Sequence, residues 1–191
     1  PADPVVEISP VTPHTSDDLL AVLVVPAVDP NRTDDEVYYS YQWFRDGELT
    51  DVTIATVHAQ KTSRGQTWKV EVRAKDPYGK ESMGSAEAVI ANEKPVCSQA
   101  VVLPSSGGTE TDWTCECSEW SGGDPGDAPH NICTFLADGD VLAEGEDCAL
   151  SHEFTNKGMQ VTCVVTPHDG TDAGDPAETP PVTILNSAPS S

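Results

Sequence analysis

The sequence predicts an all-β chain that folds as two β-sandwich domains in tandem, residues 1–93 and residues 94–191, with about seven strands in each. The composition, an internal repeat and a two-residue hydrophobic period support this prediction. Of the 191 residues, 37% are hydrophobic and only 6% are aromatic. Thr, Val, Pro, Gly, Asp and Ser are abundant, which suits short strands and frequent turns, so we expect no long helix.

An internal repeat decides the domain organisation. Blocks of the first half recur in the second half in the same order and at nearly the same spacing, so the chain contains two copies of one unit of about 95 residues. The matching blocks are residues 18–23 and 112–117, 41–47 and 133–139, 65–72 and 158–165, and 88–95 and 182–189.

The repeated blocks have the patterns of short strands separated by turns. In residues 68–73, Trp-Lys-Val-Glu-Val-Arg, apolar and charged side chains alternate with the two-residue period of a strand that is buried on one face. The dipeptide Asp-Gly at 46–47, and again at 138–139, is a turn signal that closes a β-hairpin. Each copy is therefore predicted to be a sandwich of short strands.

The second copy contains every cysteine of the chain, six in all. An even number of cysteines in a domain of this size indicates a disulfide framework, and disulfides indicate an oxidising, extracellular or cell-surface location. A zinc site would need paired thiolates at short spacings, whereas only two of these cysteines are close in sequence. We therefore expect structural disulfides among Cys97, Cys115, Cys117, Cys133, Cys148 and Cys163.

The repeat indicates the pairing of two of these cysteines. Cys115 stands where the first copy has Ala21, and Cys163 stands where it has Val70. These positions are expected on the second and sixth strands, which face each other across the core of a sandwich. We therefore predict a Cys115–Cys163 disulfide.

The other four cysteines are assigned by the face on which each is expected to lie, among the 15 connectivities that six thiols allow. Cys117 is expected on the same side as Cys115, and Cys133 is expected on the core side of the third strand. We therefore predict a Cys117–Cys133 bridge. Cys97 and Cys148 then remain, on the first and fifth strands, and we predict that they pair with each other.

Several motifs of both copies carry a family resemblance. They are the strand starts at 18–20 and 112–115, Tyr-Gln-Trp-Phe-Arg-Asp-Gly at 41–47, Gly-x-x-Trp/Val-x-Val/Cys at 65–70 and 158–163, and Ile-x-Asn-x-x-Pro at 90–95 and 184–189. Both copies are similar to the tandem immunoglobulin-like repeats, related to PKD and cadherin-like modules, of bacterial secreted and cell-surface proteins.

The resemblance implies two tandem immunoglobulin-like β-sandwich domains of about seven strands each. A cystine between the sheets beside an aromatic ring resembles the immunoglobulin core, with Phe135 as the aromatic residue of the second copy and Trp43 as its counterpart. The first copy has no cysteine, so aromatic packing by Trp43 and Trp68 is expected to fill its core.

The chain is strongly acidic, with 32 acidic and 10 basic residues and a formal net charge of −22. This charge opposes binding to nucleic-acid phosphates and to anionic lipid surfaces, and no apolar run is long enough to span a membrane. We therefore expect neither nucleic acid binding nor membrane insertion. Residues 1–93 contain 16 acidic and 8 basic residues, whereas residues 94–191 contain 16 and 2, so the two copies present different surfaces to a partner.

Calcium is the one cofactor that the acidic loops suggest, because hard cations bind clustered carboxylate oxygens. No loop follows the Asp-x-Asp-x-Asp-Gly pattern, and a solvated acidic surface explains the same residues. The candidate calcium ligands are Asp29, Asp34, Asp35, Asp124 and Asp127, with Asp169, Asp172 and Asp175 in other loops.

The sequence contains no motif for catalysis. The five histidines occur without a Gly-x-Ser-x-Gly elbow or a His-Glu-x-x-His zinc motif. Paired cysteines leave no expected thiol nucleophile, and 32 acids provide carboxylate pairs too freely to indicate glycoside hydrolysis. We expect that the protein is not an enzyme.

The repeat also suggests a function. Residues 184–189 match the short junction between the copies at 90–95, as though another copy should follow, and such a junction favours a stiff rod. We expect a structural repeat, or a subunit that assembles head to tail with copies of itself, in a bacterial extracellular filament or surface stalk. The alternative is an adhesin-type module whose end loops, including Trp120 and residues 124–127, bind a carbohydrate or a host surface protein.

Overall fold

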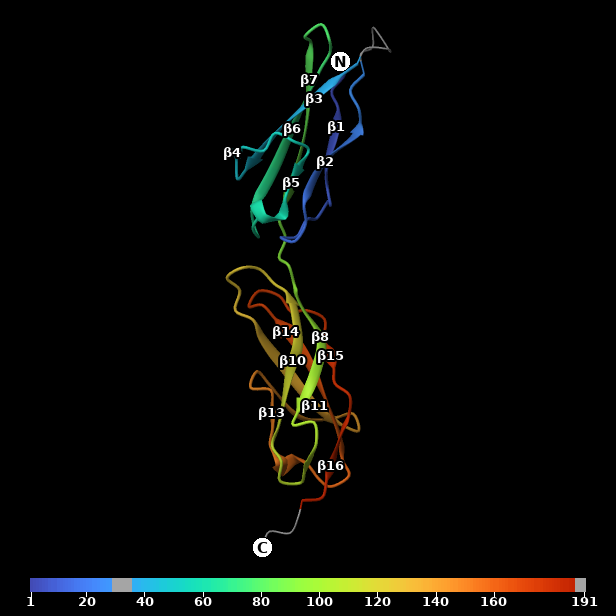
Figure 1. The fold of residues 1–191 in the computed structure, drawn as a ribbon, viewed down its shortest axis with the longest axis vertical. Helices are drawn as coiled ribbons and strands as arrows, with labels where there is room; N and C mark the ends of the chain where they lie inside the picture. Colours follow the sequence, from blue (N-terminus) through green and yellow to red (C-terminus); the bar gives the residue numbers. More distant parts are fainter. Residues whose placement is uncertain (29–35, 188–191) are drawn as a thin grey trace. The chain divides into compact units, whose positions relative to one another are not determined.

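The computed structural model describes residues 1–28 and 36–187. The chain divides into two compact units, Pro1–Glu93 and Lys94–Ser191, at the boundary that the repeat predicts. Both units are built from β-strands (Figure 1), and the described residues contain no helices other than two short 310 turns. Neither turn has the length or the apolar character that crossing a membrane requires. The predicted class, two tandem immunoglobulin-like β-sandwiches, is confirmed.

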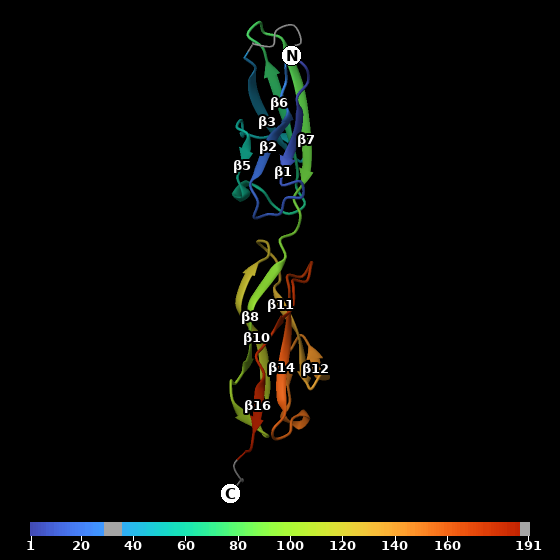
Figure 2. The same ribbon diagram turned by 90° about the vertical axis from the view of Figure 1, so that its right-hand side faces the viewer.

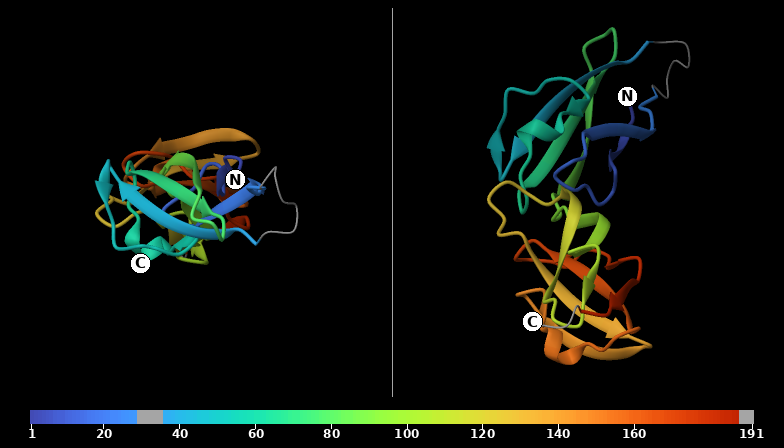
Figure 3. Two further views of the ribbon diagram at one scale, coloured as in Figure 1. Left: turned by 90° about the horizontal axis from the view of Figure 1, so that it is seen from above. Right: turned by 60° about the horizontal axis from the view of Figure 1, so that its bottom comes forward.

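The first unit has seven strands in its described residues, arranged in two antiparallel sheets of order β1-β2-β5 and β4-β3-β6-β7. The tilted view of Figure 3 separates the blue strands β1 and β2 from the cyan and green strands of the other sheet. The elements are β1 Val5–Ser9, β2 Leu19–Val25, β3 Tyr38–Arg45, β4 Glu48–Leu49, β5 Thr56–Val57, η1 Ala59–Lys61, β6 Thr67–Lys75 and β7 Glu81–Val89.

The second unit repeats this plan with sheets of order β13-β10-β8 and β12-β11-β14-β16-β9, and β15 pairs with β14. Figure 2 shows β8 beside β10 on one side of the unit and β11, β14 and β12 on the other. The elements are β8 Pro95–Leu103, β9 Gly107–Gly108, β10 Trp113–Gly122, β11 His130–Ala137, β12 Asp140–Gly145, β13 Ala149–Leu150, η2 His152–Phe154, β14 Gln160–His168, β15 Ala177–Glu178 and β16 Val182–Leu185.

The two predicted Asp-Gly turns have the backbone geometry that a tight hairpin needs. Asp46 and Gly47 have φ angles of 52° and 84°, and Asp138 and Gly139 have φ angles of 52° and 89°. Two consecutive positive φ angles match the twist of the flanking strands. The turns therefore fix the register of β4 against β3 and of β12 against β11.

Two tryptophans form the centre of the first core, as predicted. Trp43 on β3 and Trp68 on β6 are fully buried and meet edge to face, with ring centroids 6.3 Å apart. The indole Nε1 of Trp43 donates to the carbonyl of Ile54 at 2.9 Å, and that of Trp68 donates to Gln66 Oε1 at 3.1 Å. Because both polar atoms have partners, the rings contribute apolar contact without an unsatisfied donor.

The second core combines a cystine with an aromatic ring. Phe135 on β11 is buried and lies directly opposite Cys163 in the β11–β14 register, just as Trp43 lies opposite Val70 in the β3–β6 register. The alignment of the two copies is therefore reproduced at the level of strand pairing. Trp113, which the sequence analysis did not assign to the core, is also fully buried.

The stability of the second unit should depend on the disulfide between its sheets. Replacing Cys115 and Cys163 by the residues of the first unit, C115A with C163V, should lower the free energy of unfolding by about 4 kcal/mol, because the bridge closes a separation of 48 residues. Scanning calorimetry of the full chain should show a lower transition temperature for the second unit and an unchanged one for the first.

A matched control removes a bridge that closes a shorter loop. The double variant C97A/C117A removes a bridge between cysteines that are 20 residues apart in the sequence. It should lower the free energy of unfolding by about 3 kcal/mol, because a shorter loop is released. If the C115A/C163V chain unfolded at the temperature of the unaltered protein, the inter-sheet bridge would not be a stabilising element.

Candidate functional site

All six cysteines form disulfides in the structure. Cys115 pairs with Cys163 and joins β10 to β14, which belong to different sheets, as the repeat predicts. The other two bridges are Cys97–Cys117 and Cys133–Cys148, so the predicted pairs Cys117–Cys133 and Cys97–Cys148 are wrong.

Strand order explains both errors. β10 lies between β8 and β13, so Cys97 on β8 is separated from Cys148, which directly precedes β13. Cys97 instead meets Cys117 on the neighbouring strand β10, where irregular pairing brings their Cα atoms within 5.7 Å. Cys133 lies opposite Gly145 on β12, close to the connection that carries Cys148. The Cys97–Cys117 bridge therefore joins neighbouring strands of one sheet. The Cys133–Cys148 bridge joins β11 to the connection between β12 and β13, where the carbonyl of Cys148 accepts from the amide of Cys115 on β10.

The sulfur atoms of Cys115, Cys133 and Cys163 lie within 4.8 Å of one another in the buried core. This is the only group of three or more potential metal-ligating side chains at such distances in residues 1–28 and 36–187. Each of these sulfurs is already bonded to another sulfur, so none is a thiolate ligand or a nucleophile.

The five histidines contact carboxylates, backbone groups or each other, and within residues 1–28 and 36–187 none is hydrogen-bonded to a Ser, Thr or Cys side chain. The ring Nδ1 of His14 lies 3.6 Å from Oδ2 of Asp17. His130 and His168 stack with ring centroids 4.8 Å apart, and the Nδ1 atom of each is hydrogen-bonded to the backbone. A base held against a nucleophile is therefore not formed by any of these rings.

An Asp–His contact recurs in both units. Asp112 Oδ1 accepts from the backbone N–H of His152 at 2.9 Å and from its ring Nδ1 at 2.7 Å. In the first unit, Asp18 accepts from the amide of Ala59 at 2.7 Å and from the ring of His58 at 3.1 Å. These hydrogen bonds lower the pKa of both aspartates, and in each case the bond from the backbone amide has the larger effect. The hydrogen bond that the His152 ring donates to Asp112 raises the pKa of His152.

The Asp112–His152 contact gives a pH dependence with a defined sign. Because the pKa of His152 is raised in the folded chain, the contact stabilises the fold below the ordinary histidine value of 6.5, and this contribution is lost as pH rises through the higher folded pKa. The pKa of Asp112 is lowered, so its contribution is present above the ordinary value of 3.8 and is lost as pH falls through the lower folded pKa.

Proton NMR titration of the His152 ring tests this contact. D112N should bring the pKa of His152 down toward its ordinary value, because the acceptor charge is lost. D18N removes the equivalent carboxylate of the first unit and should leave the titration of His152 unchanged. An unchanged His152 titration in D112N would contradict the contact.

A hollow of about 320 Å³ lies at one end of the second unit, where the sequence analysis placed an adhesin-type binding loop. Trp120, which is half-buried, lines it together with Asp124 and Asp127. Asp169, at the end of β14, completes the wall and is almost fully buried. Asp127 Oδ2 accepts from the amide of Asp124 at 2.6 Å, which closes the loop on itself.

The structure bears on the predicted calcium ligands only in part. Asp29, Asp34 and Asp35 lie outside the described residues. Asp124 and Asp127 line one hollow, but they do not belong to a close group of three or more ligating side chains within the described part of the chain. Calcium binding by these aspartates stays a prediction.

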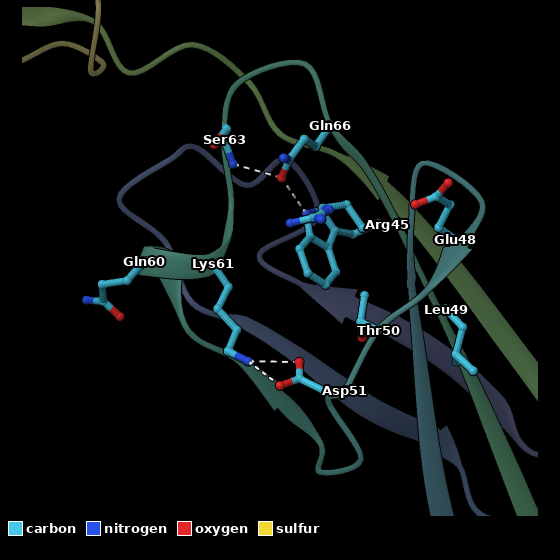
Figure 4. Close-up of a pocket in the computed structure, with 10 residues that line it drawn as sticks. Arg45, Glu48, Leu49, Thr50, Asp51, Gln60, Lys61, Ser63 and Gln66 are labelled. Carbon is cyan, nitrogen blue, oxygen red and sulfur yellow. Dashed lines mark hydrogen bonds and ion pairs between the residues drawn. The ribbon is translucent and has the colours of Figure 1, made fainter.

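A larger groove, of about 520 Å³, lies in the first unit between the β3–β4 hairpin and the segment from η1 to β6 (Figure 4). Lys61 reaches from η1 to Asp51, with its Nζ atom 3.0 and 3.2 Å from the two carboxylate oxygens, and this lowers the pKa of Asp51. Gln66 and Arg45 line the same groove. The sequence analysis missed this groove because its polar side chains lie in turns and follow no motif.

Comparison with known proteins finds likeness only among solved structures, since no family model and no curated protein matches the chain. The fibronectin(III)-like modules of Clostridium thermocellum CbhA are 15% identical, with 95% of each chain covered and a TM-score of 0.31. A two-domain fibronectin type-III segment of chicken tenascin is 12% identical, with 93% of this chain and 97% of that chain covered and a TM-score of 0.45.

A calcium-stabilised adhesin with which an Antarctic bacterium binds ice is 10% identical, with 97% of this chain and 49% of that chain covered and a TM-score of 0.34. These identities and TM-scores are too low to carry an argument about function.

Proposed function

We propose that the chain is a structural repeat of a bacterial extracellular filament or surface stalk, which assembles head to tail with further units of the same kind. The observation that carries this proposal is the connection between the two units. β7 ends at Val89 and β8 begins at Pro95, so residues 90–94 alone join the last strand of one sandwich to the first strand of the next.

The backbone at the start of this connection is bound to the first unit. The amide of Ile90 donates to the carbonyl of Gln66 at 2.9 Å, and the carbonyl of Ile90 accepts from the amide of Gly65 at 2.8 Å. The amide of Ala91 donates to the carbonyl of Pro13 at 2.7 Å. The chain therefore leaves the first sandwich under restraint from two different loops.

The remaining residues of the connection are also bound. The side-chain oxygen of Asn92 accepts from the Arg64 guanidinium, and Glu93 accepts from the hydroxyl of Ser16 at 2.6 Å. The carbonyl of Lys94 lies against the glycine that ends β10 in the second unit. Each of residues 90–94 thus has a contact with the unit to which it is attached.

The short connection supports a structural role, because the repeats of a stalk are joined by short segments rather than by long flexible linkers. The three disulfides of the second unit also fit this role, because they covalently restrict how far that sandwich can extend under tension.

Lengthening the connection tests its mechanical role. Insertion of Gly-Ser-Gly-Ser between Glu93 and Lys94 should broaden the distribution of molecular dimensions seen by small-angle X-ray scattering, because the inserted residues lack the hydrogen bonds of the native connection. The same four residues inserted in the 124–127 loop are the control, since that loop lies within the second unit. Equal distributions for all three proteins would contradict the proposed role.

Electron microscopy tests assembly itself. The purified chain at increasing concentration, and the native cell surface, should show filaments with an axial repeat of one or two units. Sedimentation as a monomer over the whole concentration range, with no filaments on the cell, would rule out head-to-tail assembly.

A second candidate function, an adhesin-type binding module, is favoured by the hollow at Trp120. An indole ring beside loop carboxylates is a suitable surface for a sugar ring and its hydroxyls. If this hollow binds a carbohydrate or a surface protein, W120A should abolish the signal of the chain on a glycan array or on host cells. W120F, which keeps an aromatic face, should retain part of that signal, whereas equal signals for W120A and the unaltered chain would exclude this site.

A further inference from the structure

The groove of Figure 4 differs from the equivalent place in the second unit, although the two units share one fold. Arg45 lies opposite Trp68 in the β3–β6 register, and Ala137 lies opposite Val161 in the β11–β14 register. Arg45 of the first unit therefore corresponds to Ala137 of the second, which is buried. The fold does not require a cation at this position.

Two more positions of the groove show the same difference. Gln66 and Met159 occupy equivalent positions. The backbone carbonyl of each accepts a hydrogen bond from an isoleucine amide, that of Ile90 in the first unit and that of Ile184 in the second. Lys61 and Phe154 are the third residues of η1 and η2. Met159 packs against the hydrophobic core of the second unit. The first unit thus has Arg45, Lys61 and Gln66 where the second unit has three apolar side chains.

The groove contains hydrogen-bond donors beside two carboxylates, Glu48 and Asp51, of which Asp51 is paired with Lys61. Gln66 Oε1 accepts both from the amide of Ser63 at 2.9 Å and from the indole of Trp68 at 3.1 Å, which fixes the orientation of the amide and leaves its NH2 group as a donor (Figure 4). The hydroxyl of Thr50 is already bound, since it donates to the carbonyl of Trp43. The donors that a ligand with acceptor atoms would meet are therefore the Gln66 amide and the Arg45 guanidinium.

Arg45 is the strongest of these donors. Its guanidinium has no hydrogen bond or ion pair with any residue that the structure describes, although the chain contains 32 acidic residues. Three lysines of the same unit, by contrast, each lie within 3.3 Å of a carboxylate: Lys61, Lys69 and Lys75. Glu48 is opposite Arg45 in the β3–β4 hairpin without forming an ion pair with it. A planar guanidinium without a partner suits a carboxylate from outside the chain.

The shape and polarity of the groove favour a saccharide over a peptide. Peptide docking uses apolar pockets for anchoring side chains. Of the two apolar residues that line this groove, Leu49 is exposed, but Trp68 is only 1% exposed, so the indole ring offers almost no contact surface. Hydroxyl, amide and charged side chains form most of the remaining wall. A volume of about 520 Å³ is within the usual range for a small-molecule site.

We propose that this groove binds a carboxylated saccharide, such as a chain of uronic-acid residues, and that the Arg45 guanidinium holds the carboxylate while the Gln66 amide donates to a neighbouring oxygen. The proposal does not depend on whether the chain forms a filament, and its site is separate from the hollow at Trp120.

Isothermal titration of the full chain with a tri-galacturonate tests the site. R45A, which introduces the residue that the second unit has at this position, should weaken binding by roughly tenfold or more, because a charge-assisted hydrogen bond is lost. R45K keeps the positive charge but not the planar guanidinium, and it should weaken binding less than R45A does. E48Q removes a nearby negative charge and should tighten binding several-fold.

Three controls make the result decisive. R73A also removes one arginine charge, but from an exposed position on β6, and this variant should bind tri-galacturonate as tightly as the unaltered chain does. A neutral trisaccharide of the same length should bind at least tenfold more weakly than tri-galacturonate. Scanning calorimetry establishes that each variant is folded.

The outcomes that overturn the proposal are equally specific. Equal affinity of R45A and R73A for tri-galacturonate would exclude Arg45 as the anchor. Equal binding of the neutral trisaccharide, or no measurable binding of tri-galacturonate, would exclude a carboxylate site. Tighter binding of a poly-glutamate peptide, lost in R45A, would replace the saccharide by an acidic protein segment.

Discussion

The packing of two sheets across one core position is the constraint on which each unit depends. In the second unit, Cys115 and Cys163 occupy this position and are covalently joined. In the first unit Ala21 and Val70 are buried there without a covalent link, and the ring of Trp43 is the cross-strand neighbour of Val70. A cystine acts mainly by restricting the unfolded chain, whereas an indole acts by removing apolar surface from water. One fold is therefore stabilised by two different physical means.

Because the core holds the sheets together, the loops and turns at the ends of each sandwich are free to differ. The β3–β4 hairpin and its counterpart β11–β12 have the same Asp-Gly turn geometry but different side chains around it. The same is true of η1 and η2, which follow matching strands. Both hollows described above lie at such ends and not over the sheets. This is the usual division in β-sandwiches between a scaffold that is fixed by packing and loops that interact with other molecules.

The sequence was sufficient for the fold and for one disulfide, because both follow from periodicity and from the repeat. Trp68 is predictable as a core residue because it stands on the apolar face of an alternating strand, whereas Trp43 and Phe135 are predicted by the repeat and the resemblance to the immunoglobulin core. The pairs Cys97–Cys117 and Cys133–Cys148 could not be found in this way. Facing alone does not distinguish a partner across the core from one on the adjacent strand, and the irregular register of β10 beyond Cys117 leaves no signal in the sequence. The groove at Arg45 was missed for a related reason, since tertiary contact assembles it from separate turns.

A tandem repeat separates the requirements of the fold from those of binding, because each copy is a control for the other. Asp18 and Asp112 keep the same character in both copies, because each accepts from the backbone amide of the first residue of the following 310 turn, Ala59 or His152, and folding explains such a contact. Positions at which one copy is apolar and the other charged need another explanation, because the fold demonstrably forms without the charge. Arg45 and its counterpart Ala137 are such a pair. A chain that serves as a repeated structural element can for this reason acquire a binding site in one copy without weakening the core that both copies share.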